Sequence, residues 1–167
     1  LRQLVQFIQR PDALLRWRAV EALGRVAVVL PPSDPSLEET LRGLFWMMND
    51  ESGNLCRMAP EAIGEILSAR PDLRPAFSPL LPQFLHEEPF EAGCLWALCR
   101  LISSGGAEPE GVDPEDLALS LSHEDPRRRG LARRFCRMTR RPAPPAPPVV
   151  FEDYDPEAGE VISTREE

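Results

Sequence analysis

Hydrophobic residues recur along most of the chain at the spacing of amphipathic helices. One set at positions i, i+3, i+4 and i+7 comprises Ala19, Ala22, Leu23 and Val26. The same pattern returns 40 residues later in Ala59, Ala62, Ile63 and Ile66. Alanines make up half of the first set, and small residues let a neighbouring helix come close. The pattern therefore predicts helices that pack tightly against one another.

Caps and helix-breaking residues set the expected bounds of these helices. We expect helices over 1–9, 13–29, 55–69, 90–103 and 126–139, with turns at 10–12 and 49–54. Ser36 or Asp34 is expected to cap a further helix, whose inner face comprises Leu37, Leu41, Leu44, Phe45 and Met48. A short helix is expected to begin with Asp113 as its cap and Pro114 at its first position. Pro60 should bend the helix that contains it, and three prolines should break the segment 74–86.

The helical segments resemble one another, which indicates a repeat. Residues 16–26 and 56–66 place Ala, Glu, Ala, an aliphatic residue and Gly at matching positions. Two later segments match each other at a shift of 37 residues, with His86 aligned to His123 and Gly93 to Gly130. Aligning Arg16, Cys56, Glu91 and Arg128 gives steps of 40, 35 and 37 residues. A period of about 40 residues is typical of paired-helix repeats.

The matching segments resemble the second helix of a HEAT-type repeat, whose usual form is Val-Arg-x-x-Ala-x-x-Ala-Leu-Gly. The family's Arg is present at Arg16 and Arg128, whereas the middle units have Cys56 and Glu91 there. The repeat Gly becomes Cys99 and Cys136 in the last two units. The resemblance to HEAT-like (armadillo and PBS-lyase-type) proteins implies an all-α fold, a right-handed α-α superhelix of about four helical hairpins.

The composition changes after Arg141. Residues 142–148 are five prolines and two alanines, which is typical of a polyproline spacer that reaches about 20 Å at roughly 3.1 Å per residue. Two short apolar stretches around the turn 155–159 then predict a β-hairpin, and an isolated hairpin is marginal in water. We therefore expect a HEAT-like repeat domain over 1–141, a Pro-rich linker over 142–148 and an acidic β-hairpin tail over 149–167.

Charge is distributed unevenly along the chain. Residues 126–141 contain eight Arg and no acid, whereas residues 142–167 contain one Arg and seven acids. The candidate interaction surface comprises Arg127, Arg128, Arg129, Arg133, Arg134, Arg137, Arg140, Arg141 and, on an earlier helix, Trp46. Three interpretations of the arginines stay open: a solvated end of the stack, a dock for the acidic tail of this or another copy, and a phosphate or nucleic-acid site.

Catalytic and metal-binding patterns are weak in this sequence. All 19 basic residues are Arg, which excludes the Lys of phosphate-binding loops and Schiff bases. Cys56, Cys94, Cys99 and Cys136 form no CxxC motif, and we expect them to be buried free thiols. His86 and His123 hold equivalent turn positions, so repeat geometry explains them better than catalysis. We therefore expect no catalytic residues, no cofactor and no metal.

These observations predict a non-enzymatic adaptor that binds protein partners through a helical-repeat surface. An enzyme-associated role, as a lyase-type or maturation factor for a cofactor protein, is the alternative. Nucleic-acid binding through the Arg-rich helix is third, because the remaining helices are acidic and would repel a duplex. Self-association through the tail is a further possibility. No apolar run reaches the roughly 18 residues that suggest a membrane span, so we expect a cytoplasmic protein without membrane contact. The chain starts without Met inside a helical pattern, which suggests that its N-terminus was trimmed.

Overall fold

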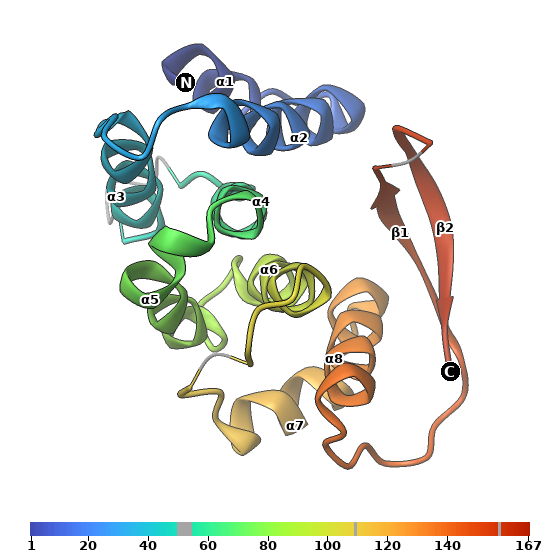
Figure 1. Cartoon of the computed structure of the whole chain (residues 1–167). Helices are drawn as coiled ribbons and strands as arrows, with labels where there is room; N and C mark the ends of the chain where they lie inside the picture. Colours follow the sequence, from blue (N-terminus) through green and yellow to red (C-terminus); the bar gives the residue numbers. More distant parts are fainter. Residues whose placement is uncertain (50–54, 109, 157) are drawn as a thin grey trace.

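The computed structural model describes residues 1–49, 55–108, 110–156 and 158–167. Most of these residues are helical, and a two-stranded antiparallel sheet follows the last helix (Figure 1). The α-helices are α1 (Arg2–Phe7), α2 (Ala13–Val29), α3 (Ser36–Met48), α4 (Ala59–Ala69), α5 (Arg74–Phe77), α6 (Glu91–Ser103), α7 (Pro114–Ser122) and α8 (Pro126–Thr139). The strands are β1 (Val149–Asp155) and β2 (Glu160–Glu166). No helix among the described residues is both long and apolar enough to cross a membrane.

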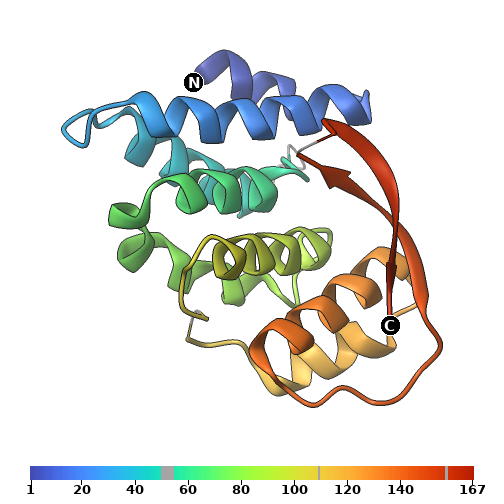
Figure 2. The same ribbon diagram turned by 45° about the vertical axis from the view of Figure 1, so that its right-hand side comes forward.

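Helices α2, α4, α6 and α8 form one continuous layer, which we call the second-helix layer. Each packs against the next in chain order, and Figure 2 shows them following one another down the molecule. Helices α1, α3 and α7 pack against α2, α4 and α8 respectively. Most of the large buried side chains lie between these packed helices. The core therefore runs through the whole stack.

Two glycines at positions that the sequence alignment matches lie where successive helices of this layer come close. A Cβ added at Gly64 of α4 would lie 2.6 Å from the Cα of Ala97 in α6. A Cβ at Gly24 of α2 would lie 2.7 Å from the Cγ of Glu65 in α4. Both separations are shorter than any normal carbon–carbon contact. At Gly64 the closest atom belongs to the backbone, so only glycine fits at that helix spacing, whereas at Gly24 the close atoms belong to the flexible side chain of Glu65. The close packing expected from the repeated small residues is therefore present.

The helix bounds follow from side-chain caps and prolines. Asp12, Asp113 and Asp125 each accept a hydrogen bond from a backbone N–H in the first turn of the following helix. These contacts confirm the starts predicted for α2, α7 and α8. The N-cap of α3 is Pro35 rather than Ser36 or Asp34, although Asp34 accepts from the N–H of Ser36, the first residue of that helix. The five inner-face residues predicted for α3 are all buried.

The predicted bend at Pro60 is wrong. Helix α4 begins at Ala59 rather than at residue 55, so Pro60 occupies its first turn. A first-turn residue has no intrahelical acceptor for its N–H, and proline therefore costs nothing there. The predicted break over 74–86 is confirmed, because α5 is four residues long and lies between the 3-10 segments η1 (Pro71–Leu73) and η2 (Ser78–Phe84). Most of the turn predicted at 49–54 lies outside the described residues.

The buried face of α2 is rotated from the predicted one. Leu23 and Ala19 are buried as expected, but Ala22 and Val26 are partly exposed, and Val20 and Ala27 are buried in their place. In α4 the predicted face is correct, and all four of its residues are fully buried. Helix α4 is flanked by both α2 and α6, which closes its apolar face on two sides.

The C-terminal hairpin runs along the side of the second-helix layer, from α8 up to α2 (Figures 1 and 2). Its antiparallel register pairs Phe151 with Thr164 and Asp153 with Ile162. Val149, Phe151 and Asp153 are buried, whereas Val150 and Glu152 between them are exposed, as the alternation of a strand requires. The linker residues 142–148 are all exposed. The hairpin itself is therefore packed on the helices at the end of an exposed tether.

Candidate functional site

Most arginines of α8 bind acceptors within the chain. The guanidinium of Arg128 donates to Glu91 Oε1 at 2.8 Å and to Ser120 Oγ at 3.1 Å, and all three side chains are buried. Arg127 donates to Glu61 Oε1 at 2.9 Å, across 66 residues of sequence. These two arginines therefore tie α8 to α6 and α4.

Some of the remaining arginines bind segments next to α8, and others bind the linker or the tail. Arg129 donates to two backbone carbonyls just before α8, and Arg141 pairs with Glu108 at 2.6 Å. Arg133 is buried and donates to the carbonyl of Pro147 in the linker at 2.5 Å. Arg140 is exposed at the C-cap of α8, in the left-handed conformation. The arginines of residues 126–141 are thus largely paired with acceptors inside the molecule.

Arg134 and Arg137 hold the acidic hairpin. Arg134 donates to Asp153 Oδ2 at 2.6 Å and to Glu166 Oε1 at 2.7 Å, and Arg137 donates to Glu166 Oε2 at 2.5 Å. The guanidinium of Arg134 also lies 5.5 Å from the ring centroid of Phe151. Asp153 and Glu166 are buried, so these ion pairs are better shielded from water than surface pairs. Of the three interpretations left open for these arginines, a dock for the acidic tail of the same chain agrees with these contacts.

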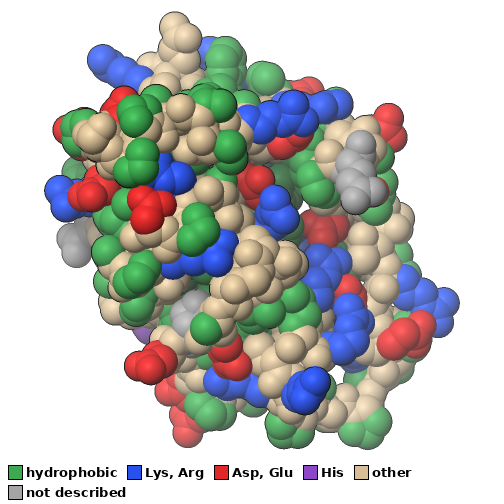
Figure 3. All heavy atoms as spheres, viewed as in Figure 1, with side chains coloured by type: hydrophobic (Ala, Val, Ile, Leu, Met, Phe, Trp, Pro, Cys, Tyr) green, Lys and Arg blue, Asp and Glu red, His purple; other side chains and the backbone are tan. Residues whose placement is uncertain are grey.

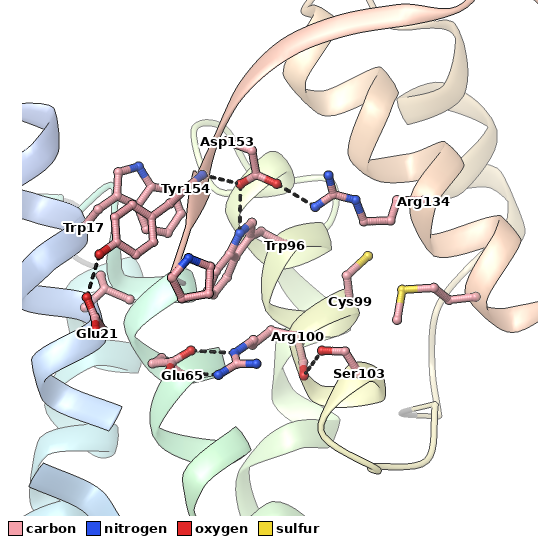
Figure 4. A pocket seen from close by; sticks show the side chains of 13 residues that line it. Trp17, Glu21, Glu65, Trp96, Cys99, Arg100, Ser103, Arg134, Asp153 and Tyr154 are labelled. Carbon is pink, nitrogen blue, oxygen red and sulfur yellow. Dashed lines mark hydrogen bonds and ion pairs between the residues drawn. The ribbon is translucent and has the colours of Figure 1, made fainter. Parts of the chain in front are cut away.

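Tyr154 forms the contact at the far end of the hairpin (Figure 4). Its ring stacks on Trp17 of α2 with centroids 5.3 Å apart, and Trp17 in turn lies against Trp96 of α6. The Tyr154 hydroxyl donates to Glu21 Oε2 at 2.5 Å. This bond is the main reason that the pKa of Glu21 lies below its usual value, while burial, followed by the same bond, raises the pKa of Tyr154 to about 12.

Asp153 connects the contacts that the hairpin makes with α8 to those that it makes with α6. Its Oδ1 accepts from the indole Nε1 of Trp96 at 3.1 Å, while Oδ2 accepts from Arg134. One carboxylate therefore binds α6 and α8 together. Figure 4 shows Asp153 between Trp96 and Arg134, with Tyr154 directed towards Glu21.

A cavity of about 220 Å³ remains between the hairpin and the second-helix layer. Its lining combines aromatic and aliphatic side chains with charged pairs: Trp17, Val20, Glu21, Glu65, Trp96, Cys99, Arg100, Ser103, Arg134, Met138, Asp153, Tyr154 and Pro156. Arg100 and Glu65 form a two-point ion pair at 2.7 and 3.1 Å in this lining, and the bond to Glu65 raises the pKa of Arg100. In the space-filling view, basic and acidic side chains lie together along the seam between helices and hairpin (Figure 3).

Several contacts to the C-terminal segment come from positions that the sequence alignment matches. Glu21, Glu61, Trp96 and Arg133 each lie five residues after the aligned positions of their units. Three of them bind the C-terminal segment through Tyr154, Asp153 and Pro147, whereas Glu61 binds Arg127. The sequence analysis did not identify Glu21, Trp96, Asp153 or Tyr154 as site residues. The alignment of the helical segments offered a signal for Glu21 and Trp96, which hold matching positions, but none for Asp153 and Tyr154, which lie in the tail.

The other predicted candidates lie apart from this cavity. Trp46 on α3 is 64% exposed and does not line it. His123 Nδ1 accepts from the N–H of Asp125 at 3.1 Å, which is a turn contact before α8, and His86 is exposed beside Glu87 and Asp116. Among the described residues, no three His, Cys, Asp or Glu side chains are grouped as metal ligands.

The four cysteines are buried and free. Burial raises the pKa of Cys56 to about 11 and that of Cys99 to about 12, so both are thiols at neutral pH. A neutral thiol is a poor nucleophile, and Cys99 therefore contributes packing rather than reactivity to the cavity. As a whole, the site can hold an extended polypeptide through aromatic stacking and paired charges.

Comparisons with known proteins add one relative. An uncharacterised protein of Archaeoglobus fulgidus is 36% identical over 75 residues, which is 45% of this chain. The match spans 38% of that protein's own length. The chain matches no protein-family model and no solved structure. The function therefore has to be argued from the geometry of the site.

Proposed function

We propose that this protein is a non-enzymatic protein–protein interaction module built as a HEAT-like right-handed superhelix of four helical hairpins. The consecutive packing of α2, α4, α6 and α8 supports this fold, as does the close approach of the next helix at the matching positions Gly24 and Gly64. In such a stack the second helices present one extended surface, and extended surfaces of this kind bind polypeptides.

A single observation carries the proposal: the second-helix face already holds a polypeptide segment. The hairpin is bound by α2 through Glu21, by α6 through Trp96 and by α8 through Arg134. Aromatic and Arg side chains are the residue types enriched at binding hot spots. The face therefore has the chemistry of a protein-binding surface at α2, α6 and α8.

The pairing of the α8 arginines favours a protein partner over a nucleic acid. Arg127, Arg128 and Arg134 bind carboxylates of the same chain, which reduces the charge available to neutralise phosphates. The titratable groups of the cavity are also bound to one another, as in the Glu65–Arg100 and Glu21–Tyr154 contacts. This arrangement suits recognition better than proton transfer.

Affinity capture from the source organism tests the proposal. The immobilised full chain should retain a protein that can be purified and shown to bind at a defined stoichiometry. Binding should weaken at least tenfold for Arg100→Glu, which reverses a charge on the second-helix face, and should persist for Trp46→Ser on the opposite side of the α3–α4 pair. The two variants must melt like the parent chain for the comparison to count.

A different result would exclude this function. Retention of nucleic acid without protein, with a binding constant that falls steeply as salt rises, would show a nucleic-acid protein instead. Binding that is lost with Trp46→Ser and retained with Arg100→Glu would place the binding surface at α3, outside the second-helix layer.

A further inference from the structure

We infer that the C-terminal hairpin is a resident substitute for a partner segment, and that the second-helix face binds an extended acidic segment carrying an aromatic residue next to a carboxylate. The inference rests on the proposed function and specifies its partner class. It is drawn from the contacts that hold Tyr154, Asp153 and Glu166 of the hairpin.

Each contact defines a requirement for the segment. The ring of Trp17 accepts a stacked aromatic ring, and Glu21 accepts a hydrogen bond from a donor at the edge of that ring. Trp96 Nε1 and Arg134 together bind a carboxylate on the adjacent residue, as they bind Asp153. These groups select an Asp-Tyr pair or a close chemical equivalent.

A second carboxylate completes the pattern at the α8 end. Arg134 and Arg137 hold both oxygens of Glu166, which lies on the other strand. Because each oxygen is bound by a different arginine, the orientation of the carboxylate is fixed, and hydrogen bonds between charged groups are stronger than neutral ones. The surface therefore fits two acidic groups at separate points, with the aromatic residue beyond the first.

The resident hairpin fills this surface incompletely. The cavity of about 220 Å³ lies directly beside Tyr154 and Asp153, above the Glu65–Arg100 pair. It is smaller than the roughly 300–1,000 Å³ of typical small-molecule sites, and much larger than the space of a single water. Apolar residues such as Val20 and Met138 contribute to its lining. An additional apolar side chain of a partner segment has room in this cavity and would give that segment more contact area than the hairpin has.

The tether explains how an imperfect occupant stays bound. Two-stranded hairpins are marginal on their own, but a short tether gives an effective concentration in the millimolar range. A partner binds only while the hairpin is away, so its apparent affinity falls in proportion to the free fraction of the face. If the hairpin is undocked about 1% of the time, binding is about 100-fold weaker than to an open face.

The test uses a fluorescent synthetic peptide of residues 149–166 and three full-length chains. The first is the intact chain. The second, Asp153→Asn with Glu166→Gln, removes both buried carboxylates of the tail and leaves the helical face unchanged. The third, Glu152→Gln with Glu167→Gln, makes the same charge change at exposed tail positions. The peptide should bind the second chain at least tenfold more tightly than the intact and third chains, measured by fluorescence anisotropy. Adding Arg134→Gln to the second chain should remove that binding.

Equal affinity for the second and third chains would overturn the inference, as would a second chain that melts normally and binds no peptide. If the second chain does not fold, hydrogen exchange on the isotopically labelled intact chain replaces the binding experiment. Excess peptide should then increase the exchange of the chain's own residues 149–155. Unchanged exchange refutes the inference. The proposed function and this inference can be distinguished by a captured partner. A captured partner that binds all three chains equally supports an interaction module and rejects the tail as a competitor.

Discussion

The hydroxyl of Tyr154 lies 2.5 Å from a carboxylate oxygen of Glu21, 133 residues away in the sequence. This contact joins the turn end of the hairpin to the first helix of the second-helix layer. Because the linker leaves the stack after α8, the hairpin spans the layer from its last helix to its first. It therefore links the first and last helices of the layer, which also meet where the Arg127 guanidinium lies 5.8 Å from the centroid of the Trp17 ring.

Replacing Tyr154 by Phe should loosen the hairpin without unfolding the helices. The variant keeps the ring on Trp17 and loses the bond to Glu21, and a hydrogen bond to a charged group contributes about 1.5–3 kcal/mol, less where water reaches it. We expect a loss of about 1–2 kcal/mol, which is roughly a 5- to 30-fold increase in hydrogen exchange at residues 149–155. Tyr154→Ala should have a larger effect because it also removes the stacking. Equal exchange in Tyr154→Phe and the parent chain would show that the bond contributes nothing.

Docking of the hairpin should weaken at high pH. Burial and the bond to Glu21 raise the pKa of Tyr154 from 10 to about 12. The folded state therefore holds this proton more tightly than the unfolded state, so the stabilisation is complete below pH 10 and is lost as the pH rises towards 12. The same bond lowers the pKa of Glu21, so its contribution is present above pH 4.5 and is lost as the pH falls below that value. Exchange at residues 149–155 measured across both ranges checks these signs, and Tyr154→Phe should abolish the part of the alkaline loss that Tyr154 causes.

Gly64→Val should destabilise the stack, whereas Gly43→Ala should not. A Cβ at Gly64 meets the backbone of Ala97, and overpacking of this kind costs about 1–3 kcal/mol or more. A Cβ at Gly43 in α3 meets nothing within 4 Å, so alanine there should stabilise the helix by about 0.5–1 kcal/mol. Urea unfolding of both variants provides the measurement. A neutral Gly64→Val would show that α4 and α6 can move apart freely.

The buried pair of Arg128 and Glu91 should be strongly coupled. Removing one partner, as in Arg128→Met, leaves a buried carboxylate unpaired and should cost about 3–5 kcal/mol. The double variant Arg128→Met with Glu91→Leu should recover most of that loss, because two apolar residues leave no uncompensated charge. The exposed pair of Arg42 and Glu38 is the control, where Arg42→Gln should change stability by less than about 0.5 kcal/mol. If the double variant is as unstable as Arg128→Met, packing rather than charge sets the cost.

The sequence by itself determined the local structure of this protein. The extents of α2, α6 and α8, the cap at Asp113 and the strands of the tail were all evident from hydrophobic spacing and from residues that begin or end helices. These features depend on interactions within a few residues, so their signals lie in short windows of sequence. The acidic tail and the Arg-rich helix were also evident, since net charge needs no coordinates.

Only the tertiary structure decided which partners those charges and rings have. Arg127 could have joined any acid of the chain, and it binds Glu61, whereas Arg134 binds Asp153. The buried face of α2 was likewise set by its neighbours rather than by its own periodicity. Long-range pairs depend on the path of the whole chain, and charge or hydrophobicity alone does not distinguish one partner from another. The site on the second-helix layer therefore emerged only when helices far apart in the sequence were placed side by side.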